Sequence, residues 1–294
     1  MNDAIAAPVL ATAPGRLRDW ANAVVGPAGA FVAQDLTGEL WQLTAEGRRV
    51  VILLDDPATA IADLVELGVA PLSAASLLGA MLALASDSGR SPAPSFVSRT
   101  VGGDAASLCR RVRAALGLAE DMTVPPALPE PGRPSGRLAG ALADAYLVPL
   151  KSYAAGAIQA LVHWPRTAFR LGEPPHETAP ERVELVGPSR SLVYGPYLPL
   201  PAGWWEVELR MYFSEEACRR TFTVDMVAED NIGTIRLKPT SAGTFRARMI
   251  FHNPRADFPL ALRVVLEHGA IEGRMGLESV LLRHSRSATA YNRH

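Results

Sequence analysis

The sequence predicts an α+β protein of two domains: an N-terminal α/β domain with a parallel sheet, followed by a C-terminal antiparallel β-sandwich of the jelly-roll kind. Three observations predict this fold class. Strand-like and helix-like segments alternate over residues 16–121. From residue 183 onward, strand-like segments follow one another at regular spacing, separated by turn residues. The chain of 294 residues, 48% hydrophobic and 20% charged, is large enough for two globular cores.

The expected domain organisation has six parts. They are a flexible N-terminus (1–15), the α/β domain (16–121), a proline-rich linker (122–136), a helical connector (137–181), the β-sandwich (182–284) and a flexible tail (285–294). The linker is predicted because MTVPPALPEPGRPSG holds five prolines and shows no periodicity.

Within the α/β domain, strands are expected in the segments 30–35, 48–57 and 95–101. The second of these is a continuous apolar run, typical of a parallel strand that is covered on both faces. Helices are expected at 36–44, 58–67, 71–86 and 104–116, and two more in the connector at 137–147 and 151–163. Aspartate caps support two of these helices, because Asp56 and Asp104 precede apolar periodic stretches.

The sandwich is clearest at residues 203–213, where side chains alternate between two faces as in a strand with one buried side. The face predicted to be buried carries Trp205, Val207, Leu209, Met211 and Phe213. The face predicted to be exposed carries Trp204, Glu206, Glu208, Arg210 and Tyr212.

Composition excludes some classes of partner. The net charge of -1 and a pI of about 6.6 give no overall attraction to nucleic acid or to an anionic membrane. The N-terminus has no basic region followed by a long apolar core, and no window reads as a membrane span, so a cytoplasmic location is expected. No cofactor is expected.

Residues 30–118 resemble the bacterial sulfotransferase-like domains found beside polysaccharide-assembly enzymes. The segments that carry the resemblance are AFVAQDLTGELWQL, VVILLDDPATAIADL and ASLCRRVRAALGL. In that family an arginine and a serine hold a phosphate of the nucleotide donor, and Asp55 and Asp63 stand at those positions. Carboxylates repel a phosphate and donate no hydrogen bond to it, and no phosphate-binding glycine-rich loop is present in the sequence. The resemblance therefore implies a truncated, degenerate domain that has lost donor binding.

Residues 185–284 show a second resemblance. The stretch GPYLPLPAGWWEVELRMYF is similar to the GPY-x-x-LPAG-x-Y motif of carbohydrate-binding-like β-sandwiches in bacterial glycan-biosynthesis proteins. The matching residues are Gly195, Pro196, Tyr197, Leu200, Pro201 and Gly203. Trp204 and Trp205 stand where one small polar residue and one aromatic residue are more usual. The resemblance implies a sugar-recognition or enzyme-docking module.

Glycan contact is the most specific chemistry that the side chains suggest. Sugars stack apolar C–H faces on aromatic rings, while charged groups hydrogen-bond their hydroxyls. The candidate glycan-binding residues are Tyr194, Tyr197, Trp204, Glu206, Tyr212, Arg246, Arg248 and His252. The alternatives are structural: Tyr197 fixes a turn, Trp204 packs under the N-terminal helices, and the basic residues pair with Glu206 or Glu208 across strands.

Candidates for metal binding and catalysis are weaker. The histidines lack ligand spacing, so no transition-metal site is expected. Asp225, Glu229, Asp230 and Asn231 could offer oxygens to a structural calcium ion, with a plain turn as the alternative. Asp55 and Asp56 lie at the C-terminal end of a predicted parallel strand, where α/β folds place ligands. They are candidate functional carboxylates, and the alternative is a helix-capping or surface role. No nucleophile motif of the Gly-x-Ser-x-Gly type occurs.

The leading hypothesis is a non-catalytic glycan-binding or enzyme-docking protein of bacterial cell-surface polysaccharide biosynthesis. One alternative is an active sulfo- or glycosyltransferase whose donor site is not visible in the sequence. Another is a structural protein that assembles into homo-oligomers through the helices of 137–163.

Overall fold

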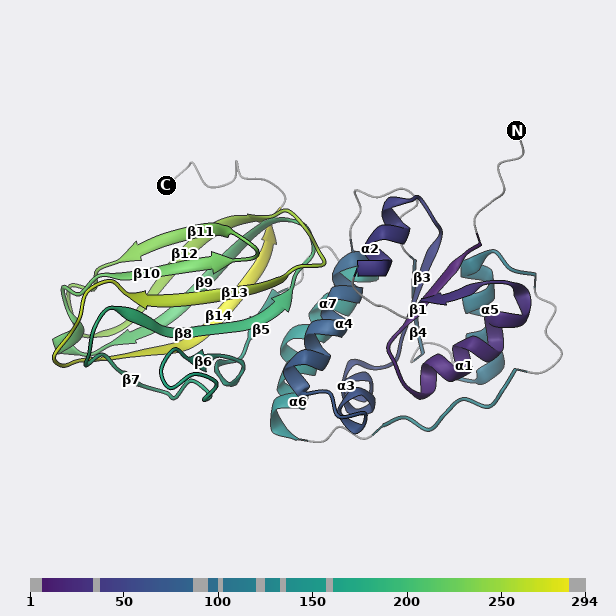
Figure 1. Cartoon of the computed structure of the whole chain (residues 1–294), viewed down its shortest axis with the longest axis horizontal. Helices are drawn as coiled ribbons and strands as arrows, with labels where there is room; N and C mark the ends of the chain where they lie inside the picture. The colour runs from purple at the N-terminus through teal and green to yellow at the C-terminus, as the bar shows by residue number, and fades with distance from the viewer. Residues whose placement is uncertain are drawn as a thin grey trace. The chain divides into compact units, whose positions relative to one another are not determined.

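The computed structural model describes residues 7–33, 38–86, 95–99, 103–119, 125–132, 136–156 and 161–285. The chain divides into two compact units, residues 1–157 (unit 1) and 158–294 (unit 2). Parts of the predicted flexible ends and of the predicted linker lie outside the described residues, namely 1–6, 286–294, 122–124 and 133–135. Figure 1 shows the elements of each unit.

Unit 1 contains a parallel sheet of four strands, as the alternating pattern predicts. The strands are β1 (Val9–Thr12), β2 (Phe31–Ala33), β3 (Val50–Leu54) and β4 (Ser95–Ser98), in the order β2-β1-β3-β4. Strand β1 falls in the segment expected to be a flexible N-terminus, and that expectation is wrong there. The four residues VLAT are buried because β1 pairs with β2 on one side and β3 on the other.

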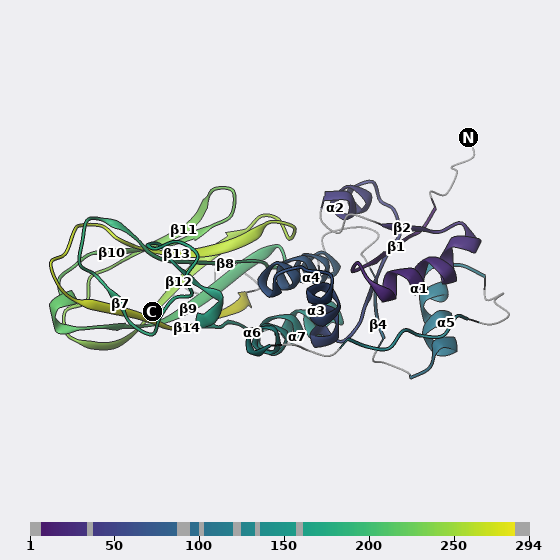
Figure 2. The ribbon, with the colours of Figure 1, turned by 60° about the horizontal axis from the view of Figure 1, so that its bottom comes forward.

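Helices cover both faces of this sheet. They are α1 (Arg16–Val25), α2 (Gly38–Ala45), α3 (Pro57–Glu66), α4 (Pro71–Ala85) and α5 (Ala105–Leu116). Figures 1 and 2 show α1 and α5 on one side of the sheet and α3 and α4 on the other. The predicted caps are confirmed: Asp56 accepts a hydrogen bond from the Ala58 amide at 3.1 Å, and Asp104 accepts one from the Ser107 amide at 2.6 Å.

The first part of the predicted connector belongs to unit 1. Helix α6 (Arg137–Leu142) continues through a π-helical turn (Ala143–Leu147) into α7 (Val148–Ala154), and these turns pack against α3 and α4. Their buried face is apolar and includes Tyr146, which is fully buried. The buried face of these helices therefore packs within unit 1, while Val148 on α7 remains 42% exposed.

The helix predicted for 151–163 ends at Ala154, and Leu161–Trp164 forms strand β5 instead. The segment LVHW alternates in burial, with Val162 and Trp164 inside, and Pro165 follows it. It pairs with a strand more than a hundred residues later, a partner that local sequence cannot reveal.

The described part of the proline-rich linker, 125–132, lies within unit 1 and is held there through its carbonyl groups. The Trp20 indole N–H donates to the Pro126 carbonyl at 3.0 Å, and the Arg99 guanidinium donates to the Pro129 carbonyl. Proline lacks an amide N–H but keeps its carbonyl as an acceptor. This stretch is therefore anchored, whereas proline content alone predicts a free linker.

Unit 2 consists of two antiparallel sheets, as predicted. The β8 sheet has the order β11-β10-β13-β8-β6, and the β9 sheet has the order β12-β9-β14-β5 with β7 paired to β14. The bounds are β6 (Arg170–Leu171), β7 (Val183–Glu184), β8 (Arg190–Pro199), β9 (Gly203–Phe213), β10 (Phe222–Val227), β11 (Asn231–Leu237), β12 (Gly243–Asn253), β13 (Pro259–Leu266) and β14 (Arg274–Ser285).

The predicted alternation of β9 is confirmed along its whole length. Trp205, Val207, Leu209, Met211 and Phe213 are buried, while the residues between them are half-buried or exposed. Strand β6 and strand β5 also belong to the sheets, so residues 161–171 are not part of a helical connector. No helix among the described residues is long and apolar enough to cross a bilayer.

Candidate functional site

The candidate glycan-binding residues lie on two different sheets of unit 2. Six are on the outer face of the β9 sheet: Trp204, Glu206 and Tyr212 from β9, and Arg246, Arg248 and His252 from β12. Tyr194 and Tyr197 lie on β8, in the other sheet. Consecutive strands β8 and β9 enter opposite sheets after the turn at residues 200–202, so the aromatic set does not form one site.

Trp204 and His252 form an aromatic pair at one end of the β9 sheet. They face each other across β9 and β12, with ring centroids 5.0 Å apart and an interplanar angle of 59°. Trp204 is 36% exposed, so part of its indole ring faces solvent while the histidine supports the rest. The expectation that Trp204 presents an outward ring is consistent with this placement.

A cluster of charged side chains lies next to this aromatic pair. Arg248 Nη2 is 2.7 Å from Glu208 Oε2, and Arg248 Nε is 3.6 Å from Glu206 Oε1. Arg246 Nε is 4.0 Å from Glu208 Oε1. The cross-strand pairing considered as an alternative is thus present. The arginine side chains of these pairs are half-exposed or more, whereas the side chains of Glu206 and Glu208 are only 16% and 22% exposed.

Tyr212 lies far from the aromatic pair and is covered by an arginine. It lies eight positions after Trp204 along one strand, a distance of about 27 Å at the rise of an antiparallel strand. The Arg182 guanidinium carbon lies 3.9 Å from the centre of the Tyr212 ring. Arg182 also lies 3.5 Å from Glu278, which pairs with Arg210 at 3.0 Å. Tyr212 therefore belongs to a cation–π and ion-pair cluster at the other end of the sheet.

Sequence reasoning did not identify Arg182 as a neighbour of Tyr212. Arg182 precedes β7, thirty residues earlier in the chain, and reaches the sheet because β7 pairs with β14. No local periodicity marks such a contact.

Tyr197 projects from a bulge in β8. The pairing between β8 and β13 shifts between Leu260 and Ala261, which leaves Tyr197 without a partner in the ladder. Its φ is 64° and it is 50% exposed, while Tyr194 packs edge-on against it at 6.2 Å. A non-glycine residue at positive φ costs of order 1–3 kcal/mol, and bulges re-aim side chains at sheet surfaces. The Tyr197 ring is thereby directed outward, away from the β9 sheet.

Two of the four residues considered for calcium, Asp225 and Asn231, belong to a hydrogen-bonded network on the β8 sheet. Asp225 accepts hydrogen bonds from Arg263 at 2.8 Å, Thr234 at 2.9 Å and Asn231 at 3.0 Å. Burial acts to raise the pKa of Asp225, but these hydrogen bonds together lower it. The Asp225 oxygens already have donors. Over the described ranges, no group of three or more His, Cys, Asp or Glu residues is placed to hold a metal ion.

Glu267 belongs to a separate hydrogen-bonded group on the same sheet, with Thr223 and Arg236. The hydrogen bonds from Arg236 and Thr223 lower the pKa of Glu267 from 4.5 to about 2. Because the folded pKa lies below the unfolded one, the ionised Glu267 stabilises the fold above pH 4.5, and this contribution is lost as the pH falls toward about 2.

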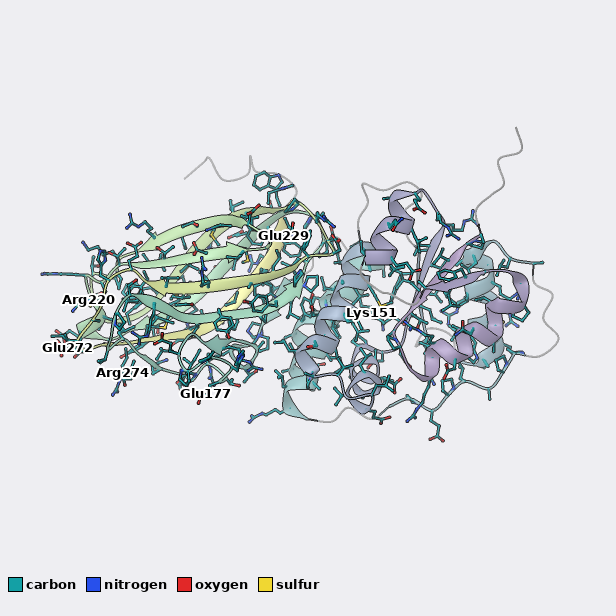
Figure 3. The ribbon with its side chains drawn as sticks, viewed as in Figure 1. Lys151, Glu177, Arg220, Glu229, Glu272 and Arg274 are labelled. Atoms are coloured by element: carbon teal, nitrogen blue, oxygen red, sulfur yellow. The ribbon has the colours of Figure 1, made fainter. Side chains whose placement is uncertain are left out.

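We therefore expect Glu267→Gln to be less stable than the parent near neutral pH, with the difference shrinking below pH 4.5. Urea unfolding over a pH series measures this. Glu272→Gln, which removes an exposed carboxylate (Figure 3), is the control for the loss of one negative charge. A difference that stays constant with pH would contradict the assignment.

In unit 1, the carboxylates at the end of β3 have structural partners. Asp55 Oδ2 is 2.7 Å from Arg99 Nη1, and both side chains are largely buried. Asp56 caps α3, which was one of the alternatives for it. Burial raises the pKa of Asp63, and its Oδ1 is buried without a hydrogen-bond partner among the described residues. Asp55 is therefore committed to an ion pair.

Comparisons with known proteins give partial structural matches. No protein-family model and no curated protein sequence matches the chain. BiXyn10A CBM1 in its apo form is 14% identical, with 30% of this chain and 58% of that chain covered and a TM-score of 0.24. TmCBM61 in complex with β-1,4-galactotriose is 12% identical, with 44% and 84% covered and a TM-score of 0.27. A cyclase from Fischerella sp. TAU is 12% identical, with 43% and 74% covered and a TM-score of 0.27. Matches of this level decide neither ligand nor activity.

Proposed function

We propose that unit 2 binds a carbohydrate at the Trp204 end of the β9 sheet. The observation that carries the proposal is the partly exposed Trp204 ring, supported at 5.0 Å by His252, beside the Arg248 ion-pair cluster. An exposed indole offers an apolar face to sugar C–H groups. The neighbouring carboxylates and guanidinium offer acceptors and donors to sugar hydroxyls.

The charged cluster suits exchange with a ligand. Arg248 contacts both Glu206 and Glu208, so the three groups hold one another in position before a sugar arrives. The Arg248 side chain is 52% exposed while those of Glu206 and Glu208 are 16% and 22% exposed, so a sugar hydroxyl would meet the guanidinium first. The cluster also supports a non-catalytic role, since glycoside cleavage needs two carboxylates with the scissile bond between them, and here a guanidinium bridges the pair.

The broader proposal is a non-catalytic glycan-binding or enzyme-docking protein in bacterial cell-surface polysaccharide biosynthesis, located in the cytoplasm. Its support is the sequence resemblance of residues 185–284 to modules of glycan-biosynthesis proteins. A degenerate sulfotransferase-like origin of unit 1 belongs to the same proposal. The proposal also includes a jelly-roll topology for unit 2. Its support is that consecutive strands alternate between the two sheets, except that β11 follows β10 in the same sheet.

Binding to an array of bacterial surface glycans, followed by titration calorimetry on a bound glycan, tests the proposal. Trp204→Ala is expected to weaken binding about tenfold or more, because the stacking face is lost. Tyr197→Ala, which removes an exposed ring from the opposite sheet, is the matched control and should leave the dissociation constant unchanged.

Two results would contradict this site. In one, the parent protein binds no glycan, or Trp204→Ala binds as the parent does. In the other, Tyr197→Ala abolishes binding while Trp204→Ala does not, which would move the site to the β8 sheet.

A further inference from the structure

Residues 125–132 (the strap) are held in unit 1 by side chains that donate hydrogen bonds to strap carbonyls. The bonds run from Trp20 to Pro126 at 3.0 Å, from Arg99 to Pro129, and from Arg16 to Glu130 at 3.5 Å. The Leu128 side chain also packs against the apolar core of the unit. A segment held by a few bonds to side chains can open locally while the sheet and helices beneath it stay folded.

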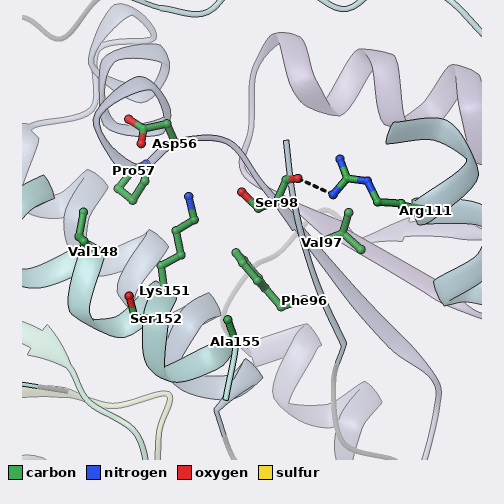
Figure 4. Close-up of a pocket in the computed structure, with 10 residues that line it drawn as sticks. All are labelled: Asp56, Pro57, Phe96, Val97, Ser98, Arg111, Val148, Lys151, Ser152 and Ala155. Carbon is green, nitrogen blue, oxygen red and sulfur yellow. Dashed lines mark hydrogen bonds between the residues drawn. The ribbon is translucent and has the colours of Figure 1, made fainter. Parts of the chain in front are cut away.

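The strap anchor at the end of β4 is itself held in place. Arg99 directly follows this strand, and the carbonyl of the preceding residue, Ser98, accepts a hydrogen bond from Arg111 Nη1 at 3.0 Å (Figure 4). A pocket of about 500 Å³ that includes Lys151 lies beside the same strand end (Figure 4). Neither Asp63 nor any strap residue lines that pocket, so the strap covers a different part of unit 1.

The last residue of the strap lies on a carboxyl group of α3. Gly132 is buried, and a methyl group added to it would overlap Asp63 Oδ1 and lie 3.3 Å from Ala62 Cβ. The backbone can approach α3 this closely because glycine has no side chain. Asp63 Oδ1 is buried and has no hydrogen-bond partner among the described residues. The closed strap therefore covers a carboxyl oxygen without giving it a donor.

The cations near Asp63 already have carboxylate partners. Arg16 of α1 is 2.7 Å from Glu66, and Arg99 is 2.7 Å from Asp55 at the end of β3. The strap, α6 and the π-helical turn, which also border α3, contribute the exposed side chains of Glu130, Arg137 and Asp144. An ionised Asp63 is thus one negative charge more than the two ion pairs balance.

Burial raises the pKa of Asp63 above its ordinary value of 3.8, and it outweighs the lowering effect of Arg16 and Arg99. In the open state water would hydrate the carboxylate, so the higher pKa belongs to the closed state. Closure is then independent of pH below 3.8. It becomes less favourable as the pH rises from 3.8 to the closed-state pKa, and it is constant again above that pKa.

We propose that the strap is a proton-linked latch, which closes over α3 when the Asp63 carboxyl group is protonated and opens more readily when that group ionises. Opening removes the strap carbonyls from Arg16 and Arg99 and uncovers the carboxyl group. The latch is independent of the carbohydrate face of unit 2, because all of its residues belong to unit 1.

The indole proton of Trp20 reports the strap in the full-length chain, because it bonds to the Pro126 carbonyl and the ring is only 4% exposed. Its exchange with solvent, measured by NMR and corrected for the intrinsic rate at each pH, gives the equilibrium constant for opening. This constant should rise by up to about tenfold per pH unit above 3.8 and then level off. The carboxyl carbon resonance of Asp63 should titrate at the pH where the constant levels off.

Three variants complete the test. Asp63→Asn cannot ionise, so its opening constant should not depend on pH. Glu130→Gln removes an exposed carboxylate from the strap itself and should keep the pH dependence of the parent. Gly132→Ala should open about tenfold more at every pH, because the added methyl group overlaps Asp63 Oδ1.

Four results would overturn the proposal. They are an opening constant of the parent that does not change with pH, a pH dependence that persists in Asp63→Asn, a carboxyl group of Asp63 that titrates at or below 3.8, and a Gly132→Ala variant that opens no more than the parent.

Discussion

Gly79→Ala is expected to destabilise unit 1 by about 1–3 kcal/mol, as overpacking of a filled core does. Gly79 lies within α4, and a methyl group added there would lie 2.2 Å from the hydroxyl oxygen of Tyr146 and 2.8 Å from its ring. Tyr146 is fully buried between packed helices, so its ring cannot move aside without displacing neighbours. In an unobstructed helix the same substitution stabilises by about 0.5–1 kcal/mol, so the expected effect has the opposite sign.

Gly140→Ala provides the matched control. Gly140 lies within α6, where an added methyl group meets nothing within 4 Å, so the substitution should stabilise unit 1 slightly. Hydrogen exchange measured by mass spectrometry on the full chain reports the stability of each unit separately. In a Tyr146→Leu background, Gly79→Ala should lose most of its penalty, because the clashing ring is gone. Equal effects of Gly79→Ala and Gly140→Ala would show that Tyr146 does not fill this space.

Trp205→Ala is expected to cost unit 2 about 3–5 kcal/mol, the usual range for truncating a buried aromatic residue. Trp205 is fully buried, its indole N–H donates to the Pro201 carbonyl at 2.9 Å, and its ring packs edge-on against His284 at 5.1 Å. The substitution leaves a cavity and removes the hydrogen bond.

The neighbouring tryptophan gives the comparison for this prediction. Trp204→Ala removes a partly exposed ring and should change the stability of unit 2 by about 1 kcal/mol or less. Hydrogen exchange in β9 and β14 should therefore accelerate strongly in Trp205→Ala and little in Trp204→Ala. A similar effect of both substitutions would contradict the assignment of one ring to the core and the other to the surface.

These two tryptophans also show what the sequence could predict. The burial of Trp205 and the exposure of Trp204 follow from a two-residue period, a local property that a strand keeps wherever it is placed. The helix caps Asp56 and Asp104 were predictable for the same reason, since each acts on amides a few residues away.

The errors concern partners distant in sequence. Tyr197 and Trp204 are seven residues apart, yet they lie on different sheets, and no local pattern states which sheet a strand joins. Strand β5 was expected to be helical from the Ala and Leu spacing of residues 151–163. Its strand partner, β14, is far away in the chain, so no local pattern reveals the pairing. The segment 125–132 was expected to be a linker from its prolines and lack of periodicity, and its anchors, Trp20 and Arg99, lie in other elements.

The candidate site could be predicted only in part for the same reason. The outward face of β9 was predicted, and so was the pairing of Arg248 with Glu208 as an alternative. The cover of Tyr212 by Arg182 depends on β7, and the pocket that includes Lys151 depends on how α7 meets the end of β4. Both arise from tertiary packing, which periodicity does not encode.

The alternation of consecutive strands between the two sheets of unit 2 limits how its ligand site can be mapped. From β5 to β10 and again from β11 to β14, each strand is followed by one in the opposite sheet. A contiguous truncation of two or more strands, other than β10 with β11, thus removes strands from both layers and opens the core between them. Loss of binding in a deletion series would report unfolding, so single substitutions on the surface are the appropriate means of locating the ligand.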